Sequence, residues 1–259
     1  MRLRLFFLSL SVVALVFLSS CKDKKEDDEL VEPVSAKVVV HFTPQWQGNP
    51  FVMQSVYYDN FGNRLRIDKF MHYVTSLRLI KEDNTEVMLK DFYLLNFLNE
   101  NAIELEVPAG KYKKLKFDVG IPEAYNKDQD PAQYPSSSPL SVAGSQGMFW
   151  TWNTGYIFVK FEGMADTTAT EGQELLSPFA IHIGDDPHFR RFTTPTFSTD
   201  IVAGETKSFN VILHVDQLLA TGGVSDIDLA TDAITHTSNN LVLATTFVDN
   251  YINAVTVEQ

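Results

Sequence analysis

The sequence predicts an all-β fold: an antiparallel β-sandwich with long loops and few short helices. From residue 36 onward, segments rich in β-branched and aromatic residues recur, and several of them alternate apolar with polar side chains. Turn signals such as the Pro-Ala-Gly at 108–110 separate them, and long amphipathic helical patterns are rare. Roughly eight to ten short strands at this spacing favour two packed antiparallel sheets.

The predicted strands follow one another along the chain with one long interruption. The first, 36–42, places Val38, Val40 and Phe42 on one face and His41 on the other. Further strand-like segments are 64–80, 86–97, 102–122 with its turn, 156–163, 176–184, 208–219 and 241–248. The best helical candidates are 216–220 and 239–259. Residues 123–146 are predicted to be a polar loop, of a length that is usually functional or disordered.

The first twenty residues have the pattern of a bacterial lipoprotein signal peptide. Arg2 and Arg4 precede an apolar run, 5–18, which is short for a membrane span and suits a signal-peptide core. Two serines then precede Cys21, the only cysteine of the chain. This resembles the lipobox, whose thiol is acylated and becomes the mature N-terminus, so we predict lipidation at Cys21 and near-permanent anchoring. The alternative is an ordinary secretory peptide with an incidental cysteine.

Residues 21–35 are predicted to be a disordered acidic tether, since they are charge-dense and almost without apolar residues. Acidic residues just after a lipidated cysteine resemble the surface-export signal of Bacteroidetes lipoproteins. We therefore expect an outer membrane lipoprotein that is periplasm-facing or cell-surface exposed. Removal of residues 1–20 takes away two arginines and no acid, which changes the formal charge from −12 to −14. Such a surface repels nucleic acid, which excludes DNA or RNA as a partner.

Motifs for nucleotide binding and hydrolysis are absent: there is no G-x-G-x-x-G, no G-x-S-x-G, no H-E-x-x-H and no C-x-x-C. A metal site without thiolate must rely on imidazole, which copper and zinc share. The six histidines are His41, His72, His182, His188, His214 and His236. His41, His182 and His214 lie opposite apolar neighbours, so each is either a surface residue or part of a site. His72 lies on an apolar face, and is either a satisfied core residue or a site residue in a dry pocket.

The segment GMFWTWNTGYIFVKFEG, 147–163, holds two of the three tryptophans. Trp150 and Trp152 share a face if the segment is extended, and physical grounds favour core packing as their role. Trp46 follows His41 in a loop flanked by proline and glycine, so we expect it to be the most exposed of the three.

The order of the motifs is more informative than any one of them. FMHYVTSLRLI is followed by VPAGKYKKLKFDVGIPEAYNK, GMFWTWNTGYIFVKFEG, FAIHIGDD and finally FVDNY. This series resembles the MbnP-like copper-binding family in its Bacteroidetes lipoprotein form, over residues 36–259. Within it, Trp150, Trp152 and Tyr156 match the family's Trp-x-Trp-x-x-Gly-Tyr block.

The resemblance implies a secreted β-sandwich that binds a copper ion through histidines and, in the best-understood members, through a tryptophan oxidised to kynurenine. Such members are often encoded beside a dihaem peroxidase-like protein, which the resemblance implies as a partner. His182 occupies the His-x-Gly motif and is the leading ligand candidate, followed by His41. His72 stands where the family more often has an aromatic residue, and Trp46 is the candidate for the oxidised ligand. Many members have several cysteines, whereas the mature chain has none for disulfides.

We therefore expect a lipid-anchored copper-binding protein of the cell envelope, used for copper acquisition or handling, that is not an enzyme and has no catalytic residue. The alternative is a metal-free surface lipoprotein that binds a protein or glycan through the aromatic-rich region 123–158. The two differ in whether His41, His72 and His182 converge, because metal–nitrogen bonds are near 2 Å.

Overall fold

The computed structural model describes residues 34–99, 101–151, 155–166, 174–220 and 226–259. The signal peptide, Cys21, nearly all of the predicted tether and Trp152 lie outside the described residues. None of the helices in the described ranges is long and apolar enough to cross a membrane. Strands predominate over helices in these ranges, which confirms the predicted all-β class.

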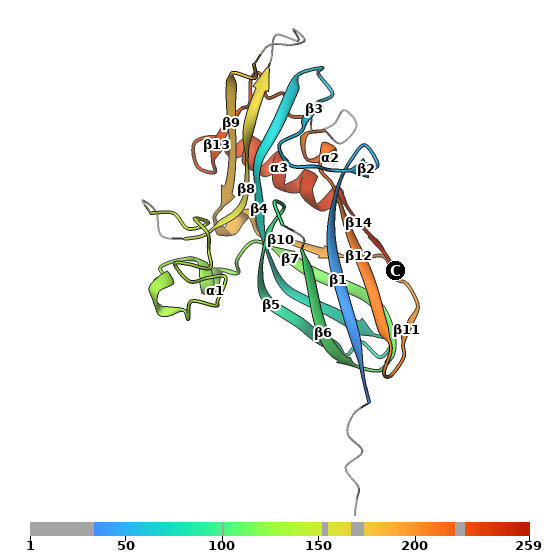
Figure 1. Ribbon diagram of the computed structural model, residues 1–259. Helices are drawn as coiled ribbons and strands as arrows, with labels where there is room; N and C mark the ends of the chain where they lie inside the picture. The colour runs from blue at the N-terminus through green and yellow to red at the C-terminus, as the bar shows by residue number, and fades with distance from the viewer. Residues whose placement is uncertain (1–33, 100, 152–154, 167–173, 221–225) are drawn as a thin grey trace, which may run out of the picture. The chain divides into compact units, whose positions relative to one another are not determined.

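The strands form two sheets (Figure 1). The five-stranded sheet has the order β14 (Val255–Glu258), β12 (Thr206–His214), β1 (Ser35–Trp46), β2 (Asn49–Pro50), and β6 (Ala102–Pro108) also pairs with β1. The nine-stranded sheet has the order β10 (Arg190–Thr193), β7 (Gly110–Val119), β4 (Arg64–Lys81), β8 (Ile157–Asp166), β9 (Ser177–Gly184), β13 (Ile234–His236). Three further strands pair within it: β3 (Val56–Tyr58) and β5 (Glu86–Asn96) with β4, and β11 (Thr199–Ile201) with β7.

Most strand pairs are antiparallel, as predicted, but two are parallel. β1 pairs in parallel with β12, and the short edge strand β13 pairs in parallel with β9. Parallel neighbours require a long crossover between them, so hydrophobic alternation along each strand could not reveal these pairings. The second one matters for function, because it places His236 directly opposite His182.

The longest helix is α3 (Leu241–Asn253), which begins where the Asn240 side chain accepts a hydrogen bond from the backbone N–H of Leu243 at 3.1 Å. Its apolar residues Leu243, Phe247 and Tyr251 recur at helical spacing and are buried. The helical prediction for 239–259 is therefore confirmed up to residue 253, and the strand-like interpretation of 241–248 is wrong. Three single-turn helices, α1 (Glu123–Asn126), η1 (Pro131–Gln133) and η2 (Asp186–His188), lie in loops, and α2 (Asp216–Leu219) follows β12.

The two sheets pack against each other around one buried core. Val38, Val40 and Phe42 of β1 are buried, as the alternation predicts, and the Phe42 ring meets the Phe117 ring of β7 edge to face at a centroid distance of 6.0 Å. Fully burying an apolar side chain of this size contributes about 1.5–3 kcal/mol relative to exposure. This packing fixes both sheets without a disulfide from the described residues, which contain no cysteine.

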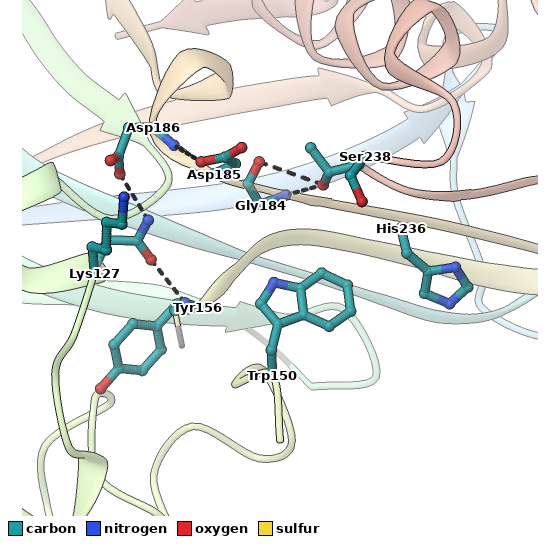
Figure 2. Close-up of a pocket in the computed structure, with 11 residues that line it drawn as sticks. Lys127, Trp150, Tyr156, Gly184, Asp185, Asp186, His236 and Ser238 are labelled. Atoms are coloured by element: carbon teal, nitrogen blue, oxygen red, sulfur yellow. Dashed lines mark hydrogen bonds between the residues drawn. The ribbon is translucent and has the colours of Figure 1, made fainter. Parts of the chain in front are cut away.

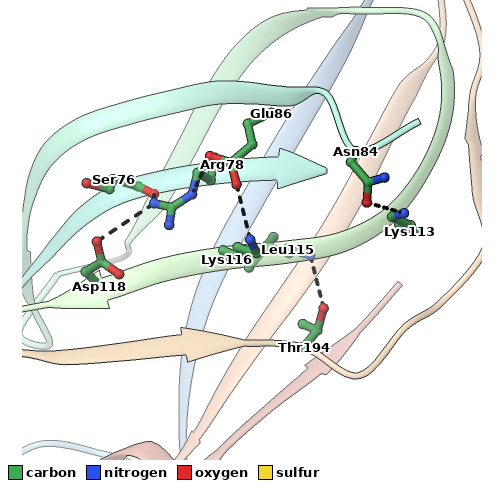
Figure 3. A network of polar contacts seen from close by, with 9 residues as sticks. All are labelled: Ser76, Arg78, Asn84, Glu86, Lys113, Leu115, Lys116, Asp118 and Thr194. Atoms are coloured by element: carbon green, nitrogen blue, oxygen red, sulfur yellow. Dashed lines mark hydrogen bonds and ion pairs between the residues drawn. The ribbon is translucent and has the colours of Figure 1, made fainter. Parts of the chain in front are cut away.

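Ion pairs tie β4 to both of its neighbours at one end of the nine-stranded sheet (Figure 3). Arg78 lies between Glu86 of β5, with 3.2 Å from Nε to Oε2, and Asp118 of β7, with 3.8 Å from Nη1 to Oδ2. Lys116 adds a contact of 3.1 Å to Glu86. Burial raises the pKa of Asp118 while Arg78 opposes the shift. These contacts hold the irregular stretch of β4, where the register shifts near residues 75–78.

Candidate metal site

One face of the nine-stranded sheet carries a row of polar side chains across four neighbouring strands. Lys69 of β4 pairs with Glu162 of β8. Lys160 of β8 pairs with His182 of β9, and His182 pairs in turn with His236 of β13. Residues directly opposite each other on adjacent strands share a face, as do alternate residues along one strand. The row therefore brings together side chains from four separate segments of the chain, on the face that points away from the buried core.

The two ring nitrogens of His182 have different surroundings. Nε2 lies 2.7 Å from Oε1 of Glu162, whose other oxygen, Oε2, lies 2.8 Å from Nζ of Lys69. The hydrogen bond from His182, supported by the one from Lys69, lowers the pKa of Glu162 to about 2 against the opposing effect of burial. Nδ1 of His182 is buried and has no hydrogen-bond partner within the described ranges.

The ring of His236 lies beside the ring of His182, with centroids 4.9 Å apart and planes at 89°. The Thr237 hydroxyl secures this arrangement: it donates to the His182 carbonyl at 3.1 Å and accepts from the Gly184 N–H at 2.8 Å. The backbone N–H of His236 donates to Asn239 Oδ1 at 2.5 Å. Burial, followed by the proximity of His182, lowers the pKa of His236. Both effects favour the neutral imidazole, which is the form that binds metals.

The indole of Trp150 packs against both histidines. Its ring centroid is 5.8 Å from that of His182 and 6.0 Å from that of His236, and the residue is 7% exposed. A hydrogen bond of 3.0 Å from its backbone N–H to the Gly155 carbonyl holds the chain just before β8. A Cβ atom at Gly184 would lie 2.9 Å from the indole Nε1, so the glycine that ends β9 permits this close approach.

A pocket of about 250 Å³ opens beside Trp150 and His236. Figure 2 shows the indole of Trp150 between Tyr156 and His236 on its wall. The long loop 123–146 contributes Asn126, which accepts from the Tyr156 backbone N–H at 2.8 Å and donates to Asp186 Oδ1 at 2.8 Å. Through Asn126 and Lys127, the loop 123–146 therefore forms part of the wall of this pocket.

His182, His236 and the covering indole of Trp150 make up what we call the two-histidine site. Within the described ranges, no three His, Cys, Asp or Glu side chains form a group suited to holding a metal ion. The two imidazoles nonetheless fit copper, which accepts imidazole nitrogen. Metal–imidazole bonds are about 2.0–2.1 Å long, so rings whose centroids are 4.9 Å apart can reach one ion. Nδ1 of His182, which is buried and has no hydrogen-bond partner among the described residues, is a candidate donor atom at this place.

The structure does not bring the three predicted histidine ligands together. His72 is fully buried, its Nε2 lies 2.8 Å from the Tyr251 hydroxyl, and burial lowers its pKa to about 3. On β8, the partner of His72 is Val159 and the partner of His182 is Lys160. Consecutive strand residues point to opposite faces, so His72 and His182 lie on opposite faces of the sheet. His72 is therefore the satisfied core residue of the two alternatives.

His41 belongs to β1 in the other sheet, where it is half-buried and faces away from the core that Val40 and Phe42 enter. It borders a shallow pocket together with Thr43 and Asn101. Of the three candidates, only His182 lies beside a second histidine ring.

Trp46 is buried and not exposed, contrary to the sequence-based expectation. Its ring stacks on Tyr57 at a centroid distance of 4.6 Å and on Phe51 at 6.4 Å, and the residue is 6% exposed. Of the two tryptophans that the structure describes, Trp150 is the one beside the histidines. Tyr156 is the other described aromatic residue of the Trp-x-Trp-x-x-Gly-Tyr block. It is fully buried and its hydroxyl donates to the Leu140 carbonyl at 2.5 Å, so its role is structural.

Sequence reasoning missed His236, Glu162 and the position of Trp150. His236 carried no motif, and only the parallel pairing of β13 with β9 brings it to His182. Glu162 does carry a sequence signal: it alternates with the buried Phe161 on β8, as His182 alternates with buried residues on β9. Two polar residues on the outer face of adjacent strands are a pattern that predicts a side-chain contact, here the one between Glu162 and His182.

The fold and the site define an all-β protein with a two-histidine site under an indole on the outer face of one sheet. A family model described as MbnP matches residues 35–240, and the chain belongs to the MbnP family. Among solved structures it is similar to MbnP from Methylosinus trichosporium, with a TM-score of 0.55 and 15% identity over 86% of this chain and 98% of that one. At this identity the likeness concerns the fold. No curated protein matches the chain.

Proposed function

We propose that this protein binds one copper ion between His182 and His236 and serves in copper acquisition or handling, without catalytic turnover. Membership of the MbnP family, which is associated with copper handling, suggests a copper-related role. The observation that carries the proposal is the pair of imidazole rings with centroids 4.9 Å apart, together with the buried Nδ1 of His182, which has no hydrogen-bond partner among the described residues. A buried polar atom without a partner is costly, and a metal ion would satisfy it.

The donor set would leave the copper ion with open coordination positions. Two neutral imidazoles are donors that suit copper, and with no third side chain the remaining positions would be open to water or to a donor that delivers the metal. The pocket beside His236 leaves a path by which copper could arrive or leave. This suits a protein that receives and releases a metal better than one that buries it permanently.

Trp150 takes the place of Trp46 as the candidate for oxidation to kynurenine. The support is its position, with its ring about 6 Å from both imidazoles, at 5.8 and 6.0 Å. Peptide mass mapping of protein isolated from its natural source tests this. Modification at Trp150 would support the assignment, whereas modification at Trp46 would contradict it.

The decisive experiment is the metal content of the mature protein after exposure to copper and exhaustive dialysis. We expect one copper per chain for the wild type, and none for His182→Ala. Retention of the fold in the variant is checked by circular dichroism. A wild-type protein that keeps no copper would contradict the proposal and favour the metal-free binding module instead.

We further propose that acylated Cys21 anchors the protein to the outer membrane. The support is the sequence alone: a short apolar run, small residues and then the only cysteine. Labelling of cells with an alkyne fatty acid tests it. The wild type should incorporate the label and Cys21→Ser should not, and an unlabelled wild type would indicate an ordinary secretory signal.

A further inference from the structure

The carboxylate of Glu162 divides its two oxygens between two partners. Oε1 lies 2.7 Å from Nε2 of His182 and Oε2 lies 2.8 Å from Nζ of Lys69. Glu162 is directly opposite Lys69 on β4, whereas it reaches His182 diagonally across β9. Two contacts on opposite oxygens fix both the position and the plane of the carboxylate, on a strand in the interior of the sheet.

This geometry determines where the proton of His182 lies. A neutral imidazole carries one N–H, and an ionised carboxylate accepts hydrogen bonds but cannot donate them. The proton of His182 is therefore on Nε2, which donates to Glu162. Nδ1 then carries the lone pair, and Nδ1 is the ring nitrogen of His182 that has no hydrogen-bond partner within the described ranges.

The second histidine of the site is held differently. The backbone of His236 is secured through Asn239 and its neighbour Thr237, but no hydrogen bond to its ring occurs in the part of the chain that the structure describes. His236 also lines the pocket. The site thus combines one imidazole whose ring orientation is set by a carboxylate with one whose ring packs against His182 and Trp150.

We propose that Glu162, held in place by Lys69, is the positioning residue of the metal site: it fixes the Nε2–H form of His182 and so presents Nδ1 to the metal. The inference rests on the proposed function of copper binding at His182. A carboxylate behind a metal-binding histidine orients the ring and raises its basicity, and removal of such a partner typically weakens metal binding about 10- to 100-fold. The inference adds that the copper ligand is Nδ1 of His182, and that Nε2 is unavailable to the metal.

The test compares Glu162→Ala and Glu162→Gln with a matched control, Glu104→Gln. Glu104 of β6 also forms an ion pair with a lysine on the neighbouring strand, Lys37, but it is exposed and belongs to the other sheet. Glu162→Gln keeps the size and an acceptor oxygen but loses the charge, so it separates positioning from folding.

The first readout is the proton position on His182 in metal-free protein, from nitrogen-15 chemical shifts of selectively labelled histidine. We expect the Nε2–H form in the wild type and in Glu104→Gln, and a mixture of both forms in Glu162→Ala. A wild type in the Nδ1–H form would overturn the inference, as would an unchanged spectrum in Glu162→Ala.

The second readout is copper affinity from competition with a colorimetric chelator, together with the nitrogen hyperfine pattern of bound Cu(II). We expect about a 10- to 100-fold loss for Glu162→Ala, a smaller loss for Glu162→Gln, and none for Glu104→Gln. Wild-type affinity in both Glu162 variants would overturn the inference and leave copper binding intact. A wild type that takes up no copper would refute the proposed function and, with it, the role of His182 Nδ1 as a ligand. The spectra of the metal-free protein would still decide whether Glu162 fixes the proton of His182 on Nε2.

Discussion

The imidazole of His182 and the imidazole of His236 meet edge to face with centroids 4.9 Å apart, although they belong to strands that are widely separated in the sequence. Their backbones are direct partners in the parallel pairing of β9 and β13. Because neighbouring strands are about 4.8 Å apart, this register alone brings the two rings to a distance from which they can share one ligand.

Substitution of His236 by alanine should therefore abolish tight copper binding as fully as substitution of His182. His41→Ala is the matched control, since His41 is a half-buried strand residue of the other sheet. Isothermal titration with Cu(I) under anaerobic conditions measures the affinity of each variant. A loss of binding in His41→Ala together with wild-type behaviour in His236→Ala would place the metal elsewhere.

Copper binding should reduce the fluorescence of Trp150 in particular. Its indole lies against both histidines, at 5.8 and 6.0 Å, whereas Trp46 stacks on Tyr57 in a separate cluster. The copper-dependent decrease in emission should remain in Trp46→Phe and be largely lost in Trp150→Phe. The opposite pattern in a fluorescence titration would show that the metal lies near Trp46.

Gly184→Ala should damage the site without touching a ligand. The added Cβ would lie 2.8 Å from the Tyr156 carbonyl oxygen and 2.9 Å from the indole Nε1 of Trp150. Overpacking of this kind typically costs about 1–3 kcal/mol, so we expect a lower free energy of unfolding and weaker copper binding. Gly204→Asn serves as the control, because nothing lies within 4 Å of a Cβ there and asparagine tolerates its positive φ of 74°. Equal stability of Gly184→Ala and wild type in urea unfolding would contradict the prediction.

The stability of the protein should decrease on acidification below about pH 6.5, partly because of His72. Burial lowers its pKa in the folded state to about 3 from the ordinary 6.5. Between pH 6.5 and pH 3, His72 is protonated in the unfolded chain but neutral in the folded chain. The stability that depends on neutral His72 is therefore fully present above pH 6.5 and is lost as the pH falls towards 3. The slope for one group approaches about 1.4 kcal/mol per pH unit.

The pair His72→Phe and Tyr251→Phe removes both partners of the buried hydrogen bond and should flatten this dependence. His188 and His236, whose pKa values are also lowered, are present in both proteins and cancel in the comparison. Glu162 makes stability depend on pH only below its ordinary pKa of 4.5, outside the range of the measurement. Urea unfolding between pH 7 and 5 is the measurement, and parallel curves for the two proteins would exclude a contribution from His72.

The all-β class, most strands and the burial of His72 could be predicted because they depend on local patterns. The stretch 64–80 became the single strand β4, and the turn at 108–110 separates β6 from β7 as expected. The strand interpretation of 241–248 failed because β-branched residues there are outweighed by the Asn240 cap and helical spacing of the buried residues. Propensity is a weak guide when capping and packing oppose it.

The sequence by itself determined that β-strands would alternate between a core face and an outer face, and that His182 would lie on the outer one. Only the tertiary structure decided which residues lie beside His182: Glu162 diagonally across one strand border, His236 across the other, and Trp150 above both. The reason is physical. Alternation depends on neighbours two residues apart, whereas the identity and register of an adjacent strand depend on how distant segments bury their apolar faces together. The candidate site lies at such borders, and so the fold assembles it.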